Sequence, residues 1–341
     1  MNLRRRPTTA ALTVGALSAT LSLSGCAALT GGDDANGSGG SGEGSRTVAA
    51  ALYPLAYVAE RVAGDAFDVE NLTSPGGEPH DLELGVRETA LVSDSALLVY
   101  VDSLQPAVDA AAEENAGGDV LDAAAVVDLM PFEGEHTHEE EHAHEDHEGH
   151  EEEGADEHAE EEGHEGHDHG ELDPHFWQDP LRMAELGDAV AERLAEIDPD
   201  EADTFTANAD ALRSDLEALD EEYVAGLADC RTSTVVTNHD AFGYLEKYGL
   251  ELESIAGISP DAEPSPGALA DLQDLIREDG ITTVFSESLV SPKTAEVLAD
   301  DAGVRTDVLD TIEGLTDDTA DEDYLSLMRA NLAALQEANG C

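Results

Sequence analysis

The stretch EADTFTANADALRSDLEALDEEYVAGL, residues 201–227, decides the fold. Its apolar residues recur at the spacing of one helix face, and they are Phe205, Leu212, Leu216, Leu219 and Tyr223. A helix of this length spans roughly 40 Å, about the height of a domain. Helical spacing also precedes it, over residues 180–197. We therefore expect residues 180–229 to form a long, rigid backbone helix that connects two domains.

Short β-branched or apolar runs alternate with amphipathic stretches on both sides of this helix, which is typical of βα units around a largely parallel sheet. Strands are expected at residues 47–52, 67–72, 96–101, 120–121, 233–237, 250–255, 281–285 and 305–309, and further helices at 54–62, 241–248, 266–278, 292–300 and 323–338. We predict an α/β fold with a first lobe at residues 47–179, a second lobe at 230–341, and a ligand in the cleft between them.

The N-terminus has the pattern of a secretory signal. Arginines at 4–6 precede a mostly apolar run over residues 10–23, which is shorter than the roughly 20 residues that a membrane-spanning helix needs. Leu23-Ser24-Gly25-Cys26 resembles a bacterial lipobox, which implies a signal peptide over residues 1–25 and lipidation of Cys26; an ordinary cleaved signal is the alternative. Two acyl chains give stable anchoring, and residues 26–46 are then expected to be a flexible tether.

Cys230 and Cys341 are the remaining cysteines. In an oxidising compartment such a pair can form a disulfide. This bridge would close a loop of roughly 110 residues, worth about 4 to 5 kcal/mol on the chain-entropy model. Two separate buried thiols are the alternative, since sequence separation says nothing about Cβ geometry.

The formal charge of −63 excludes nucleic-acid partners, because binding to phosphates requires a basic surface. Such a charge favours cations, although much of it can simply maintain solubility. The acidity is strongest at residues 133–171, where the composition changes to His, Glu, Asp and Gly with almost no apolar residue. This tract cannot bury a core, so we expect a disordered loop in the first lobe.

The tract carries ten histidines interleaved with carboxylates, an arrangement that can bind several zinc ions weakly; a merely solvated charge run is the alternative. These histidines are His136, His138, His142, His144, His147, His150, His158, His164, His167 and His169. The segment from His138 to His142 also matches the His-Glu-x-x-His pattern of zinc proteases. That pattern works only on an ordered helix with a third ligand, and a biased composition produces it by chance, so we predict no enzyme.

Three histidines lie outside the tract, at positions 80, 175 and 239, and each is expected in a loop or at the end of an element. Any one of them alone would be an ordinary solvated or core histidine. Their surroundings are PHDLEL (79–84), DPHFWQDP (173–180) and HDAFGYLEKYGL (239–250), and FSESLVSPK follows at 285–293. In this order the four segments resemble successive motifs of the zinc- and manganese-binding substrate-binding lipoproteins of ABC importers.

The resemblance implies two lobes joined by a long backbone helix, with one metal ion in the interlobe cleft. It implies His80 and His175 as ligands from the first lobe, and His239 plus a carboxylate from the second. Asp310 matches the usual position of that carboxylate, although this chain continues with Thr-Ile where the family commonly has Pro-Leu. Glu287 is the second choice, and water can also complete the shell.

Three imidazoles and one oxygen suit tetrahedral Zn²⁺, whereas a manganese site is expected to be richer in carboxylates; affinity alone does not exclude copper or nickel. The resemblance thus implies a monomer, lipid-anchored on the outer face of the bacterial cell membrane, which captures zinc and delivers it to an ABC permease with its ATPase. A manganese or iron carrier, and a surface adhesin or metal buffer, are the alternatives. Since ligand imidazoles must be neutral, affinity is expected to fall below about pH 6.5.

Overall fold

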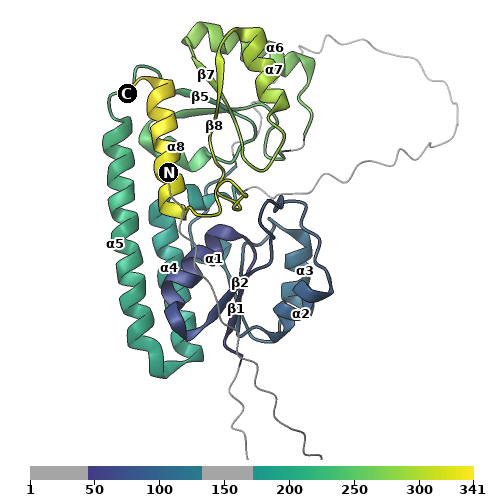
Figure 1. Cartoon of the computed structure of the whole chain (residues 1–341), viewed down its shortest axis with the longest axis vertical. Helices are drawn as coiled ribbons and strands as arrows, with labels where there is room; N and C mark the ends of the chain where they lie inside the picture. Colours follow the sequence, from purple (N-terminus) through teal and green to yellow (C-terminus); the bar gives the residue numbers. More distant parts are fainter. Residues whose placement is uncertain (1–44, 133–171, 261) are drawn as a thin grey trace, which may run out of the picture. The chain divides into compact units, whose positions relative to one another are not determined.

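The computed structural model describes residues 45–132, 172–260 and 262–341, which form two α/β lobes (Figure 1). Each lobe contains a parallel four-stranded sheet. The first sheet has the order β2-β1-β3-β4, with β1 at Thr47–Ala50, β2 at Asp68–Asn71, β3 at Leu97–Tyr100 and β4 at Asp119–Asp122. The second has the order β6-β5-β7-β8, with β5 at Thr234–Thr237, β6 at Glu251–Ser254, β7 at Thr283–Ser286 and β8 at Arg305–Val308. The predicted class, α/β with two βα lobes, is confirmed.

The two sheets share one topology, and it determines where a site can form. In each of them the second strand pairs with one side of the first strand, and the third strand pairs with the other side. The connections therefore diverge above the carboxyl ends of β1 and β5. A crevice at such a switch point is where open α/β sheets bind ligands.

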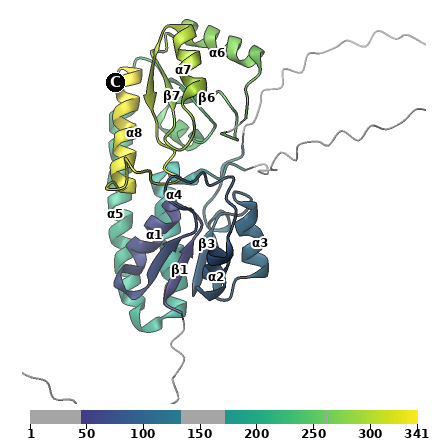
Figure 2. The same cartoon turned by 45° about the vertical axis from the view of Figure 1, so that its right-hand side comes forward.

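Helices cover both faces of the first sheet (Figure 2). One face carries α1 (Tyr53–Ala63), and the other carries α2 (Val86–Asp94) and α3 (Pro106–Glu114). In the second lobe, α6 (Pro266–Asp279) and α7 (Lys293–Ala302) lie together, while the expected helix at 241–248 is a 3₁₀ helix, η5 (Gly243–Tyr248). Helix α6 shows how sequence sets these bounds: Ser265 caps its first turn, and Gly280 ends it with a φ of 67° that favours glycine.

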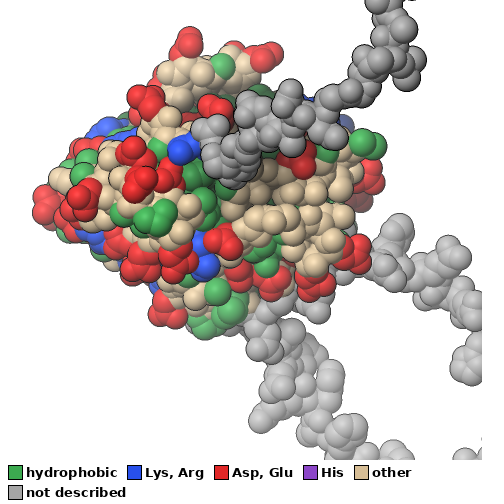
Figure 3. Space-filling view, turned by 90° about the horizontal axis from the view of Figure 1, so that it is seen from below, with side chains coloured by type: hydrophobic (Ala, Val, Ile, Leu, Met, Phe, Trp, Pro, Cys, Tyr) green, Lys and Arg blue, Asp and Glu red, His purple; other side chains and the backbone are tan. Residues whose placement is uncertain are grey.

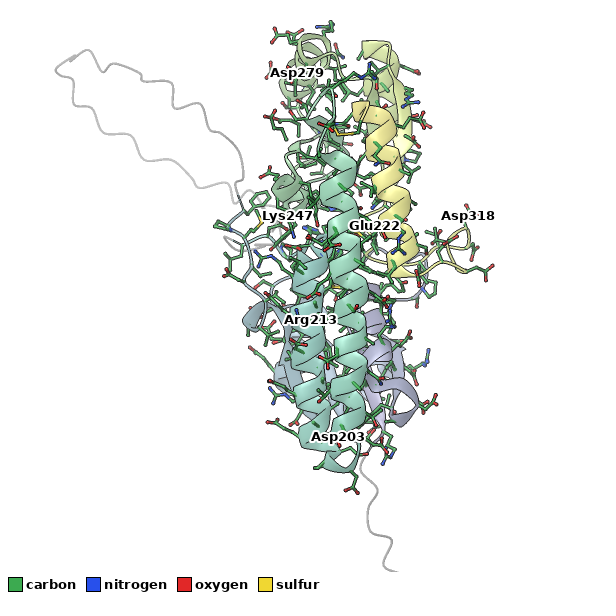
Figure 4. The ribbon with its side chains drawn as sticks, turned by 90° about the vertical axis from the view of Figure 1, so that its left-hand side faces the viewer. Asp203, Arg213, Glu222, Lys247, Asp279 and Asp318 are labelled. Atoms are coloured by element: carbon green, nitrogen blue, oxygen red, sulfur yellow. A yellow bond between two sulfur atoms is a disulfide. The ribbon has the colours of Figure 1, made fainter. Side chains whose placement is uncertain are left out.

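The connection expected over residues 180–229 consists of two helices, α4 (Pro180–Ile197) and α5 (Ala202–Leu227), which pack side by side (Figure 4). The break falls at Pro199, where a short 3₁₀ turn separates them. A proline cannot donate the backbone hydrogen bond that a continuous helix would need there. Helix α5 contacts α1 of the first lobe and also α8 (Tyr324–Asn339).

The main apolar core extends from the first sheet through these helices to η5 and α8. A smaller core lies under α6 and α7; it includes Val236, Ile276, Val284 and Leu298. Cys230 and Cys341 form a disulfide that joins the start of the second lobe to the last residue. Within the described stretches, no helix is both long and apolar enough to cross a bilayer.

Among the charged side chains seen in Figure 3, acidic ones are far more frequent than lysine and arginine, which are scattered among them. They are spread over the face rather than gathered at one point. This distribution fits the solubilising role that composition suggests for much of the negative charge.

Candidate metal centre

Four side chains converge at the meeting of the two lobes: His80, His175, His239 and Glu313. Each is buried and offers one ligand atom, and these atoms all lie within 4.8 Å of one another. The structure therefore brings together the three histidines that the sequence predicts. It adds Glu313, which is not among the carboxylates expected from the sequence.

Loops at the ends of strands position these four residues. His80 lies in the loop between β2 and α2, and His175 directly precedes the short 3₁₀ helix η3 (Phe176–Gln178). His239 follows β5 by two residues, and Glu313 lies in the loop between β8 and α8. The ligand candidates thus gather at the edge of the sheets where the topology places a site.

The spacing of the four atoms fits a tetrahedral ion. Glu313 Oε1 lies 3.4 Å from His80 Nε2, 3.4 Å from His175 Nε2 and 3.8 Å from His239 Nε2. The two nitrogens of His80 and His175 are 3.5 Å apart. Zinc bonds of about 2.0 to 2.1 Å in a tetrahedron would place ligand atoms roughly 3.3 to 3.4 Å apart. Four of the six pairs thus lie close to tetrahedral spacing, and all four atoms lie within 4.8 Å of one another.

Two of the four ligand atoms have no hydrogen-bond partner within the described part of the chain. His239 Nε2 and Glu313 Oε1 are buried and form no hydrogen bond there. An unsatisfied buried polar atom is costly and calls for an explanation such as an ion. Both atoms point to the same position, which supports metal binding at this site.

Carboxylates outside the cluster orient two of the imidazole rings. His175 Nδ1 donates to Asp173 Oδ1 at 2.8 Å, and His239 Nδ1 donates to Glu287 Oε2 at 2.7 Å. Glu287 also accepts the backbone N–H of His239 at 2.9 Å through its second oxygen. When Nδ1 carries the proton, Nε2 is the atom that can bind a metal. These two carboxylates thus direct both Nε2 atoms toward Glu313.

The close packing of charges shifts several pKa values. Burial by itself lowers the pKa of His175, but the carboxylates of Asp173 and Glu313 beside its ring outweigh burial and raise the pKa to about 10. Burial acts to raise the pKa of Glu313, yet His175 and His80 hold it well below its ordinary value. Burial and the nearby Glu313 raise the pKa of Glu78 to about 7. In the absence of metal, the site therefore holds a charged imidazole against an ionised glutamate.

A different carboxylate from the two expected ones lies beside the histidines in the structure. Asp310 does not belong to the cluster: its Oδ1 accepts the backbone N–H of Ile312 at 2.7 Å and so closes a local turn. Ile312 has a φ of 60°, and this left-handed residue turns the chain so that Glu313 reaches the histidines. This turn contains Thr311 and Ile312, the two positions at which the family commonly has Pro-Leu. Glu287, the second choice, contacts Nδ1 of His239 rather than the ligand position.

One signal in the sequence pointed to Glu313. It is the first carboxylate after Asp310 in the loop that follows the last expected strand. Cys26 and the ten histidines of the acidic tract lie outside the described residues.

A family model and several known proteins that are similar to this chain are all described as zinc-uptake or zinc-binding proteins. The family model described as zinc-uptake complex component A, periplasmic (ZnuA), matches residues 48–338. The zinc-binding lipoprotein AdcA of Streptococcus pneumoniae serotype 4 is 35% identical over 299 residues, which cover 86% of this chain and 56% of that protein. The high-affinity zinc uptake system protein ZnuA of Bacillus subtilis is 31% identical over 297 residues, covering 85% of this chain and 86% of that protein.

A solved structure is similar over the same region. The Zn(II)-bound ZnuA-like domain of Streptococcus pneumoniae AdcA aligns with a TM-score of 0.68 at 30% identity, covering 87% of this chain and 100% of the domain. The chain spans 56% of the length of the full pneumococcal protein. The similarity therefore concerns the part of AdcA that resembles ZnuA.

Proposed function

Because this chain belongs to the family of periplasmic zinc-uptake complex component A, we propose that it captures Zn²⁺ outside the cytoplasm and delivers it to the permease of an ABC importer. The observation that carries this proposal is the convergence of three buried Nε2 atoms on one oxygen of Glu313, at 3.4 to 3.8 Å. The zinc-binding names of the relatives support the same metal. Zinc is the cargo in this proposal.

The chemistry of the four residues favours zinc carriage over two alternatives. A manganese site is expected to contain more oxygen ligands, whereas three of the four candidates here are imidazoles. A catalytic zinc keeps one position for water or substrate, whereas four protein ligands close the tetrahedron. Neutral imidazoles and one carboxylate also leave the bound ion with a reduced net charge, which suits a buried site.

The predicted location is consistent with this role. Lipidation of Cys26 would hold the protein at the outer face of the membrane, and residues 26–46 would let the folded lobes move within reach of a permease. The histidine tract would bind further zinc ions weakly, in addition to the ion of the buried site. The buried site would then bind one zinc ion tightly, and the tract would hold several more ions weakly.

Uptake measurements test the carrier role directly. Bacteria lacking this gene are expected to take up radioactive zinc slowly when zinc is limiting, and the full chain should restore the rate. A chain carrying Glu313→Gln should restore it poorly. If cells without the protein take up zinc at the normal rate while the purified chain still binds the metal tightly, the protein is a metal buffer and the carrier role is wrong.

A matched pair of substitutions identifies the fourth ligand. We expect Glu313→Gln to weaken zinc binding at least about tenfold, or about 1.4 kcal/mol, because an uncharged amide oxygen is a weaker zinc ligand than a carboxylate. Asp310→Asn should change affinity little, since an amide oxygen can still accept the N–H of Ile312. Competition against a chelator of known zinc affinity measures both. The reverse ranking would restore Asp310 as the ligand.

A further inference from the structure

The loop that carries Glu313 follows the last strand of the second lobe, yet the first lobe holds its backbone. The carbonyl oxygen of Thr311 accepts two side-chain N–H groups, from Trp177 Nε1 and Gln178 Nε2, each at 2.8 Å. Both donors belong to η3, the turn directly after His175. One short segment thus supplies one ligand candidate and two anchors for the loop that carries another.

Thr311 also contacts the ligand side chain. Its hydroxyl donates to Glu313 Oε2 at 3.1 Å, and the other oxygen, Oε1, is the atom that faces the three imidazoles. A continuous chain of contacts therefore runs from Gln178 through Thr311 to the carboxylate. It leaves only one oxygen of Glu313 to meet the ion.

These contacts are buried and act on a strained turn. Thr311, Gln178 and Trp177 are fully shielded from solvent. Ile312, between Thr311 and Glu313, has a φ of 60°, a region that β-branched residues rarely adopt. Such a conformation persists only when its surroundings fix it from several sides. The hydrogen bonds to the Thr311 carbonyl are part of what fixes it.

We propose that Gln178, Trp177 and Thr311 are positioning residues for the metal ligand Glu313. Trp177 and Gln178, in the first lobe, hydrogen-bond to the strained turn at Ile312, and Thr311 leaves one oxygen of Glu313 facing the ion. This inference rests on the proposed zinc site. It predicts that breaking the chain of contacts weakens zinc binding only through Glu313.

The test uses the full chain and conservative substitutions. Gln178→Met removes a donor at similar volume, and Thr311→Val removes the hydroxyl at similar shape. Each is expected to lower zinc affinity about tenfold, the lower end of the 10- to 100-fold range typical of groups that orient metal ligands. Thr311→Ser retains the hydroxyl and should stay within about threefold of the wild type. Trp177 gives a less specific test, because its ring also packs on that of His175 at 5.2 Å.

A double-mutant cycle separates positioning from general damage. Combined with Glu313→Gln, neither Gln178→Met nor Thr311→Val should weaken binding further, because the group through which they act is already lost. The matched control is Tyr223→Phe, which removes another buried hydrogen bond, 2.7 Å to the Met328 carbonyl, away from the loop. It should cost similar thermal stability and leave affinity unchanged.

Bound Co²⁺ gives an independent spectroscopic measurement. Its visible absorption should change in the same way for Gln178→Met, Thr311→Val and Glu313→Gln. The positioning role is overturned if Gln178→Met or Thr311→Val lowers zinc affinity further in the Glu313→Gln background. It is also overturned if these single variants bind zinc like the wild type. If the wild-type chain itself shows no tight zinc site, the proposed function fails instead, so the two outcomes are distinguishable.

Discussion

Replacing His239 with alanine is expected to abolish tight zinc binding, whereas deleting residues 135–170 should leave one tight site. His239 is fully buried, and its Nε2 lies 3.8 Å from Glu313 Oε1. One ligand of four represents about a quarter of the roughly 10 to 16 kcal/mol of a structural zinc site, so affinity should fall at least about 100-fold. Metal content and chelator competition on the intact chain and both variants measure this difference.

The deletion is the matched control for this substitution. It removes all ten histidines of the tract and leaves the three histidines of the buried cluster. If the deletion eliminates tight binding and His239→Ala changes nothing, the tract is the binding device. The buried cluster would then be a structural network of ionised groups.

Zinc affinity is expected to rise about tenfold per pH unit between pH 7 and 9, because binding must displace a proton from His175. An ordinary histidine would be neutral over this range, and zinc affinity would then fall only as the pH drops below about 6.5. Asp173 and Glu313 overcome the effect of burial and raise the pKa of His175 to about 10. Chelator competition from pH 6 to 9 gives the slope. Calorimetry in buffers of different ionisation enthalpy counts the protons released.

The same raised pKa predicts that the stability of the metal-free protein falls as the pH rises, whereas zinc affinity increases. A raised folded-state pKa stabilises the fold below the ordinary value of 6.5, and this contribution is lost as pH rises through about 10. The thermal midpoint of the metal-free chain should therefore fall at alkaline pH while zinc affinity still rises. Asp173→Asn is the control and should flatten the affinity slope. A flat wild-type slope without proton release would mean that His175 is already neutral.

The sequence predicts the architecture well because the central strands β1, β3, β5 and β7 form short, mostly buried runs of β-branched or apolar residues. The expected strand at 233–237 and the observed β5 (Thr234–Thr237) differ by one residue. Helices α2 and α3 were missed, since their apolar pattern is weak and α2 buries only Val92. The boundary between α4 and α5 was visible at Pro199, but their side-by-side packing depends on tertiary contacts.

The prediction of the site depends on sequence motifs rather than on the apolar pattern that predicts the fold. Motifs identify the three histidines, because the surrounding residues recur in a recognisable order. Glu313 reaches the cluster through a left-handed Ile312 and through the hydrogen bond from Gln178 to Thr311, which is 133 residues away in sequence. No local pattern encodes these contacts. Glu287 contacts Nδ1 of His239 in the structure, and the sequence does not tell which nitrogen of that ring a carboxylate meets.

The bond between Cys230 and Cys341 makes residues 230–341, the second lobe, a closed covalent ring. A protease that cuts one peptide bond inside this ring opens it without releasing a fragment, so His239 and Glu313 stay on one molecule. Loss of material would require a second cut or reduction of the disulfide. For a protein proposed to work outside the cytoplasm, where proteases act and thiols are oxidised, such a ring would make single cleavage events survivable.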